Sequence, residues 1–159
     1  MEPSQTLELA PPAAADPGDI TEGPLARHVG FLLRLAQQRV FEEFHRRFSN
    51  TGLTPARYSV LALVGTHPGT RQVAVAGALQ IKQPNLAVLI TAMAADGLVE
   101  RRTDASNRRA NGLFLTPAGA ALLARVRPQV EAMEAEFCAG LGPGQQDALL
   151  ATLRTLLAP

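Results

Sequence analysis

The chain has 159 residues, of which 47% are hydrophobic but only 4% are aromatic. This length allows one domain with a substantial core and is too short for two ordinary domains. The abundance of alanine and leucine favours a mainly α-helical fold. A single cysteine, Cys138, excludes an internal disulfide and a cysteine-based metal cluster. No apolar run reaches the length of a membrane span, and the N-terminus lacks the basic-then-apolar order of a secretory signal. We therefore expect a soluble, cytoplasmic protein with no membrane partner.

Net charge becomes informative when it is divided along the chain. Residues 1–26 contain five acidic side chains and no Lys or Arg, so the remainder carries a net charge of +6, whereas the whole chain carries +1. Arginine supplies every positive side chain except Lys82, and guanidinium suits phosphate and base edges better than an ammonium group does. Genome composition explains an arginine bias equally well. Charge alone therefore does not establish DNA binding.

The first 22 residues are predicted to form a flexible acidic arm. They contain Pro3, Pro11, Pro12 and Pro17 with an alanine run, and they show no periodicity. Such an arm is either inert or packs across a partner subunit, where its acidic residues would meet the basic body. The sequence leaves both alternatives open.

Helical periodicity runs from Pro24 to about Phe48, with apolar residues at three- and four-residue steps. This apolar stripe is wider than one small domain needs. A second helix is expected to start at Thr54-Pro55, because a capping residue is followed there by proline at the first helical position. Residues 65–69 end it.

Two further helices follow in the order expected of a helix-turn-helix. Thr70 is expected to cap the first, Gln72 to Leu79, and the second begins after Ile81 and ends before Gly97. The turn between such helices needs a positive φ and often contains glycine, but this chain has Gln80 there. If the backbone is retained, a non-glycine residue in the left-handed region costs on the order of 1 kcal/mol.

The second of these helices has one face suited to a core and one suited to a DNA groove. Its predicted core positions, spaced i, i+3, i+4 and i+7, are Leu86, Leu89, Ile90 and Met93. Its candidate DNA-contacting residues are Gln83, Pro84, Asn85, Ala87, Val88 and Thr91, with Ala95 on the same side. Amides pair with adenine and methyl groups contact thymine, so this face is expected to prefer A·T-rich DNA. An ordinary surface helix is the alternative.

Residues 101–119 join a loop carrying four arginines to an apolar strand and then to a new helix start. This order predicts a basic β-hairpin, or wing, with Arg101 and Arg102 at its entry and Arg108 and Arg109 near its tip. Narrow A·T tracts deepen the negative potential of the minor groove, which attracts such arginines. A groove-sized helix beside a basic hairpin indicates a winged helix-turn-helix that binds double-stranded DNA.

Two helices are expected after the wing. Thr116-Pro117 begins a long helix that Pro128 should bend, and Gln145 to Leu157 form a last amphipathic helix. Apolar helices at both ends of the chain are best explained by a partner subunit that covers them. We therefore expect a homodimer whose two-fold symmetry matches a pseudo-palindromic operator.

A specific motif lies in the wing. Asn107-x-Arg109 is followed after five residues by Leu115-Thr116 and then by Pro117-Ala118-Gly119. This motif resembles the multiple antibiotic resistance regulator (MarR) family of bacterial transcription factors, whose wing carries Asp-x-Arg, Leu-Thr and often Pro-Ala-Gly at the same spacing. The resemblance covers about residues 25–158. It implies that Arg109 enters the minor groove.

Two positions depart from the family pattern. Asn107 stands where the family usually has Asp, so it can hydrogen-bond to the arginine but supplies no charge, unless Asp104 substitutes. Val88 stands where family members often carry Arg. The lost charge predicts a larger share of affinity from the wing and from phosphate contacts. The candidate phosphate donors, at a helix N-terminus, are Thr70, Arg71 and Gln72.

The resemblance also implies regulation by a small molecule, often a phenolic or other aromatic carboxylate, bound between the dimer helices and the DNA-binding regions. Candidate contacts are His28, Arg34 and Tyr58, which supply cations and a phenol. Each has an ordinary structural interpretation as well: His28 as a surface residue, Arg34 as an ion-pair partner and Tyr58 as part of the core.

Redox and metal sensing are not favoured. Cys138 has no basic neighbour in sequence to lower its pKa, so we interpret it as a packed or interfacial thiol. His28, His45 and His67 lack ligand spacing, and we expect neither a metal nor a cofactor. No nucleophile motif or glycine-rich phosphate loop is present, so no enzyme with catalytic residues is expected.

The sequence thus predicts a mainly α fold with a small β-wing. Its expected layout is an arm at 1–22, dimerisation helices at 23–50 and 117–159, and a winged-helix DNA-binding region at 51–116. The predicted function is a sequence-specific transcriptional regulator, a repressor released by a ligand. The alternative is a winged-helix dimer that acts as a protein-binding or architectural module.

Overall fold

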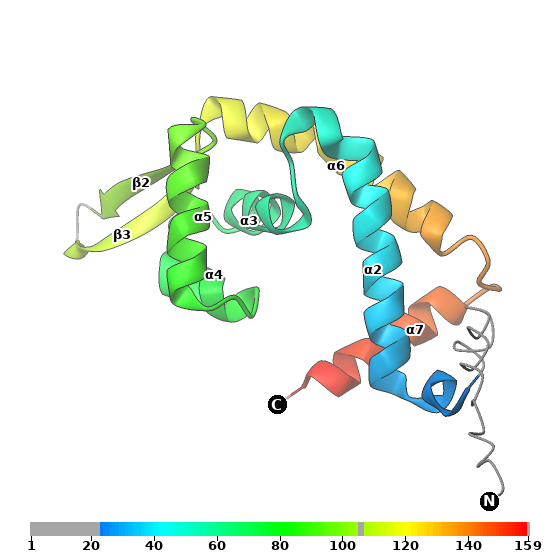
Figure 1. The fold of residues 1–159 in the computed structure, drawn as a ribbon. Helices are drawn as coiled ribbons and strands as arrows, with labels where there is room; N and C mark the ends of the chain where they lie inside the picture. Colours follow the sequence, from blue (N-terminus) through cyan, green and yellow to red (C-terminus); the bar gives the residue numbers. More distant parts are fainter. Residues whose placement is uncertain (1–22, 105–106, 159) are drawn as a thin grey trace, which may run out of the picture. The chain divides into compact units, whose positions relative to one another are not determined.

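Helices dominate the structure, a computed structural model (Figure 1). Residues 23–104 and 107–158 are described, and for Thr103, Asp104 and residues 107–111 only the backbone is. The chain divides into two compact units with the boundary between Arg39 and Val40. The predicted N-terminal arm, residues 1–22, lies outside the described residues.

The order of elements confirms a mainly α fold with a small β-wing. In chain order the elements are η1 (Pro24–Arg27), α2 (Val29–Phe48), η2 (Ser49–Thr51), α3 (Pro55–Thr66), β1 (Thr70–Arg71), α4 (Gln72–Ala78), α5 (Gln83–Ala95), β2 (Val99–Asp104), β3 (Asn107–Leu115), α6 (Pro117–Phe137) and α7 (Gln145–Leu157). The hairpin of β2 and β3 extends beside α5, and α3 lies between α5 and α6 (Figure 1).

Local capping explains where α3 and α6 begin. The Thr54 hydroxyl accepts a hydrogen bond from the Arg57 backbone N–H at 3.2 Å, and the Thr116 hydroxyl accepts one from the Gly119 N–H at 3.0 Å. Each threonine is followed by a proline, which has no N–H to satisfy. Both predicted helix starts are confirmed. The first predicted helix is interrupted, because His28 is extended and the α-helix begins only at Val29.

A three-stranded antiparallel sheet has the order β1-β3-β2. Val99 pairs with Leu115 at the base of the wing, and Asp104 pairs with Asn107 at its far end. The short strand β1, which the sequence pattern did not predict, pairs Arg71 with Gly112. A Cβ at Gly112 would lie 2.7 Å from the Gly69 carbonyl oxygen, so only glycine allows this close approach.

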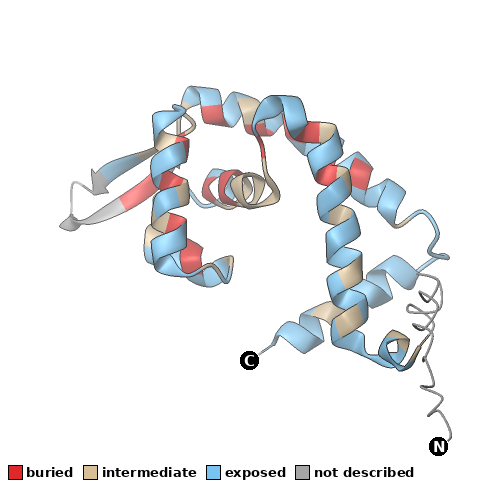
Figure 2. Cartoon of the chain, in the orientation of Figure 1, coloured by how far each residue is buried: buried red, intermediate tan, exposed pale blue. Residues whose placement is uncertain are grey.

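One hydrophobic core connects α3, α5, α6 and the base of the wing (Figure 2). The predicted core positions Leu86, Ile90 and Met93 are fully buried, and Leu89 is partly buried against them. The other buried apolar residues are Phe44, Phe48, Leu53, Val60, Leu61, Val64, Val75, Ala76, Val99, Leu113, Leu123, Val126, Val130 and Met133. This core holds α5 and the wing as one rigid support.

Gly119 makes the tightest junction in this support. It is buried in the first turn of α6, where an added Cβ would lie 1.9 Å from the carbonyl oxygen of Leu98. Leu98 connects the end of α5 to β2. The close approach therefore gives a physical reason for glycine at the last position of the Pro-Ala-Gly motif.

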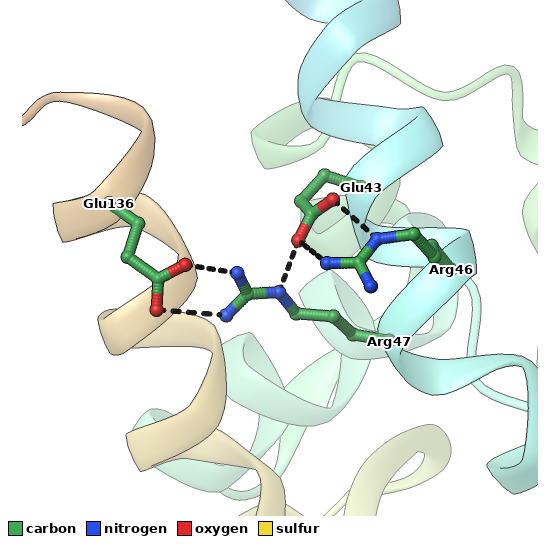
Figure 3. A network of polar contacts seen from close by, with 4 residues as sticks. All are labelled: Glu43, Arg46, Arg47 and Glu136. Carbon is green, nitrogen blue, oxygen red and sulfur yellow. Dashed lines mark hydrogen bonds and ion pairs between the residues drawn. The ribbon is translucent and has the colours of Figure 1, made fainter.

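An ionic network ties the end of α2 to α6 (Figure 3). The Glu43 carboxylate accepts two hydrogen bonds from Arg46, at 2.6 and 2.8 Å, and one from Arg47. Arg47 also donates both terminal nitrogens to the Glu136 carboxylate on α6. These bonds, first from Arg46 and then from Arg47, lower the pKa of Glu43 from 4.5 to about 2. Arg47 likewise lowers the pKa of Glu136.

Candidate DNA interface

The helices α4 and α5 form a helix-turn-helix. The chain bends by 114° between them, within the range of about 90–120° that this motif adopts. Gln80 in the turn has a φ of 52°, and it is the one non-glycine residue with positive φ among those described. Its side-chain amide donates to the Gly77 carbonyl at 2.9 Å, which holds the turn. The usual backbone of this turn is therefore retained, although glutamine stands in place of glycine.

The outer side of α5 carries the predicted DNA-contacting residues. Gln83, Pro84, Asn85, Val88 and Thr91 are exposed, and Ala87 is partly exposed. Val88 retains 71% of its surface, although valine is normally buried. α5 contains no charged residue. The helix thus presents amides near its N-terminus and methyl groups further along.

The N-terminus of α4 differs from the sequence prediction. Thr70 does not cap this helix; it lies in β1, and its hydroxyl donates to the His67 carbonyl at 2.7 Å. Arg71 occupies the capping position without a side-chain capping bond, and its side chain is exposed. Pairing of β1 with β3 overrides the local capping signal. The partly exposed Gln72 accepts a hydrogen bond of 3.4 Å from Arg101 of β2, so α4 and the wing base present adjacent polar groups.

The wing base is ordered by contacts of its own. Arg102 lies 4.7 Å over the Phe114 ring and donates to the Glu100 carboxylate, while Arg101 is exposed. The backbone of β3 carries Asn107, Arg108 and Arg109 into the wing. Their side chains lie outside the described residues, so the role of Arg109 and the effect of Asn107 stay predictions.

The helices that form this surface contain no acidic residue. No Asp or Glu occurs between Glu43 and Asp96, a stretch that spans α3, α4 and α5 and contains Arg57, Arg71 and Lys82. This run without acidic residues is readable in the sequence and could have indicated the surface. A face without acidic residues suits the phosphate backbone of DNA.

A pocket of about 470 Å³ lies between the end of α2, the start of α3 and the turn before α5. It is lined by Phe41, His45, Thr54, Pro55, Ala56, Ser59, Leu79 and Ile81. His45 contacts the Phe41 carbonyl oxygen through Nδ1 at 2.6 Å. Because that oxygen can only accept, Nδ1 carries a proton and Nε2 remains for another partner. The sequence prediction did not include His45 as a ligand contact.

The residues predicted to bind a ligand have other described contacts. Tyr58 is partly buried against the core with its ring 6.0 Å from that of Phe44, and burial raises its pKa. Arg34 donates to Gln38 at 2.9 Å and lies 5.3 Å from the Phe31 ring. His28 is exposed next to η1. Tyr58 does not line the pocket around His45.

Metal-binding clusters and single membrane-spanning helices are both absent among residues 23–104 and 107–158. No group of three His, Cys, Asp or Glu side chains could hold a metal ion there. No single helix in this part of the chain is long and apolar enough to cross a membrane, and α4 and α5 meet those criteria only as a bent pair.

The fold and this surface define a winged helix-turn-helix protein of the DNA-binding class. A sequence profile of the MarR family matches residues 51–110. The chain is also 31% identical over 146 residues to a putative transcriptional regulatory protein for the hcr operon of Thauera aromatica, covering 91% of this chain and 88% of the relative. It therefore belongs to the MarR family of transcriptional regulators.

Solved structures agree with this family. The repressor CouR bound to a 23-mer DNA duplex superposes with a TM-score of 0.78 at 35% identity, covering 92% of this chain and all of CouR. BpsR of Bordetella bronchiseptica, whose DNA binding is regulated by 6-hydroxynicotinic acid, has a TM-score of 0.79 at 29% identity over 86% of this chain and 99% of its own. A CouR structure with p-coumaroyl-CoA has a TM-score of 0.76 at 36% identity, covering 85% of this chain and 95% of CouR. These relatives do not favour an architectural or protein-binding module.

Proposed function

We propose that this chain is a homodimeric repressor that binds a pseudo-palindromic operator and is released by an aromatic effector. The observation that carries the DNA-binding part is the outer side of α5, which is exposed and free of acidic residues and belongs to the same helix-turn-helix as α4, at whose start the exposed Arg71 lies. Each subunit places α5 in the major groove and the wing along the neighbouring minor groove, with residues 51–116 as the DNA-binding region.

Dimerisation is supported by apolar side chains that the described chain leaves uncovered. No residue of α7 is buried, and its leucines at positions 149, 150, 156 and 157 are 40–81% exposed. Apolar patches of this kind on a soluble protein mark an interface. The helices in 23–50 and 117–159 cover one another across a two-fold axis, which sets the spacing of the two α5 helices on DNA.

The pocket around His45 is the effector site in this proposal. Phe41, Leu79 and Ile81 supply an apolar lining for an aromatic ring, and Nε2 of the His45 tautomer with Nδ1–H can accept a hydrogen bond from a hydroxyl group on that ring. An effector here contacts both α3 and the turn before α5, so it shifts α5 relative to the dimer helices. His28, Arg34 and Tyr58 remain predicted contacts of the effector, and the thermal shift experiment described below can test them.

No catalytic activity is proposed, because the family consists of transcriptional regulators. A regulator of transcription acts where the DNA is, which in bacteria is the cytoplasm.

DNA binding is tested by fluorescence anisotropy with DNA from upstream of the protein's own gene, beside a scrambled duplex, at two salt concentrations. We expect specific binding tighter than about 10⁻⁸ M that weakens steeply with salt, because each phosphate contact releases a counterion. Equally weak binding to both duplexes, repeated with DNA selected from a random library, would reject the function and favour a protein-binding module.

Effector binding is tested by thermal shift with 6-hydroxynicotinic acid, p-coumaroyl-CoA and related aromatic acids. An effector at a hundred times its Kd should stabilise the protein by about 2.7 kcal/mol and should release the operator. His45→Gln should abolish this shift, whereas His67→Gln, outside the pocket, should retain it. No stabilisation by any aromatic acid or thioester would count against this ligand class.

A further inference from the structure

The outer side of α5 carries a stripe of methyl groups. Val88, Thr91, Ala92 and Ala95, which we call the methyl stripe, are spaced i, i+3, i+4 and i+7 and are all exposed. The Thr91 hydroxyl donates to the Ala87 carbonyl within the helix at 2.8 Å, so its proton is not available to a ligand. An exposed helix side made of methyl groups is unusual, because such faces normally carry charged residues.

The surroundings of the methyl stripe match double-stranded DNA rather than an apolar partner. Arg71 and Arg101 are exposed on β1 and β2, and Lys82 is exposed directly before α5. No acidic residue lies within α3, α4 or α5, and Asp96, which directly follows α5, is paired with Arg57. Cations around an apolar centre fit phosphates that flank base edges. In the major groove the one apolar group on a base edge is the C5-methyl of thymine.

Guanine readout by α5 is disfavoured for a related reason. Side chains that recognise guanine in the major groove are usually Arg or Lys, which donate to its O6 and N7 atoms. α5 contains neither. Its exposed large hydrophobic side chain is that of Val88, at 71%.

We propose that Val88 determines sequence specificity by packing against the C5-methyl of a thymine in each half-site. This inference rests on the proposed DNA-binding function and specifies how that site distinguishes bases. Burial of one methyl group contributes about 0.8 kcal/mol. Its loss at one half-site should therefore raise the Kd about fourfold.

The test removes single methyl groups from the DNA. A duplex that the wild-type protein has selected from a random library is synthesised with each thymine replaced in turn by deoxyuridine, which lacks only the C5-methyl. Anisotropy titrations with the full chain should show one symmetry-related thymine per half-site at which this replacement raises the Kd about fourfold. The other thymines should change the Kd less than twofold.

Protein variants connect this effect to Val88. Val88→Ala changes both subunits, so it should bind the thymine duplex about as weakly as wild type binds a duplex in which both symmetry-related thymines are replaced, and it should lose the sensitivity to deoxyuridine. Val73→Ala is the matched control, because Val73 is a 49% exposed valine on α4 rather than α5. It should retain the full sensitivity.

The outcomes separate this inference from the function on which it rests. If wild type selects no sequence at all, the proposed function fails and the role of Val88 fails with it. Two other results are selective binding in which no deoxyuridine replacement changes the Kd, and a Val88→Ala variant that keeps the wild-type sensitivity to deoxyuridine. Either result would leave the proposed DNA-binding function intact and would overturn the contact between Val88 and the thymine methyl.

Discussion

Helix α5 and the wing have contrasting chemistry, because α5 is uncharged and the wing is rich in arginine. α5 has no charged side chain, is anchored by Leu86, Ile90 and Met93, and presents amides and methyl groups. The wing carries arginines from entry to tip on two paired strands. Neutral methyl and amide groups distinguish bases but attract DNA weakly, whereas arginines attract any duplex. Under the proposed function, sequence preference and overall affinity are therefore assigned to separate elements of this chain.

The largest expected effect comes from the junction that holds both regions together. Gly119→Val places a side chain where even a Cβ would lie 1.9 Å from the Leu98 carbonyl oxygen, and we expect a loss of about 3 kcal/mol in the free energy of unfolding. At fixed protein concentration, calorimetry should show a Tm lower by about 6–12 °C. The control Gly140→Ala, with open space around the new Cβ, should stay within about 0.5 kcal/mol. Equal stability of both variants would contradict the close approach.

The wing is tested next. Arg109→Ala should weaken operator binding at least tenfold, or about 1.4 kcal/mol, and should reduce the salt slope by about one. Because the wing supplies affinity in this comparison, the preference among operator variants should change less than the affinity does. Arg127→Ala, an exposed arginine on α6, controls for net charge. Unchanged operator affinity in Arg109→Ala would reject the assigned role of the wing.

A smaller effect is expected at the turn that orients α5. Gln80→Gly removes a side chain from a left-handed residue with φ of 52° but also removes its bond to the Gly77 carbonyl. We expect a net gain of up to about 1 kcal/mol, measured by urea unfolding. Gln129→Gly, within α6, should instead destabilise by about 1 kcal/mol. A loss of stability in Gln80→Gly would mean that the side-chain bond outweighs the backbone strain.

The smallest effect lies outside both regions, in the network around Glu43. Its pKa is lowered from 4.5 to about 2 in the folded protein, so the carboxylate stabilises the fold fully above pH 4.5 and progressively less as the pH falls toward 2. Glu43→Gln should therefore lower stability slightly at pH 7, with a difference from wild type that vanishes near pH 2. The neighbouring exposed Glu42→Gln, which lies outside this network, controls for the loss of one carboxylate in urea titrations. DNA affinity should be unchanged, which separates this network from the interface.

Short-range signals predicted much of the fold and part of the site. The prediction that Thr54 and Thr116 cap helices was correct, because a cap depends on a hydrogen bond to a residue three positions away. The sequence analysis considered a left-handed Gln80 only on the condition that the turn keeps its usual backbone, and the structure meets that condition. The prediction that Thr70 caps a helix was wrong, since its segment pairs with β3, more than forty residues further along the chain. The pocket around His45 was missed because its lining comes from three separate segments.

The sequence by itself determined the order of helices, the buried stripe of α5, the basic wing and the resemblance to one family, because periodicity, capping and motif spacing act over a few residues. Only the tertiary structure decided that β1 adds a third strand and that Gly119 must admit the Leu98 carbonyl. These features depend on which distant segments meet. Packing of the shared core, rather than local propensity, determines which distant segments come into contact.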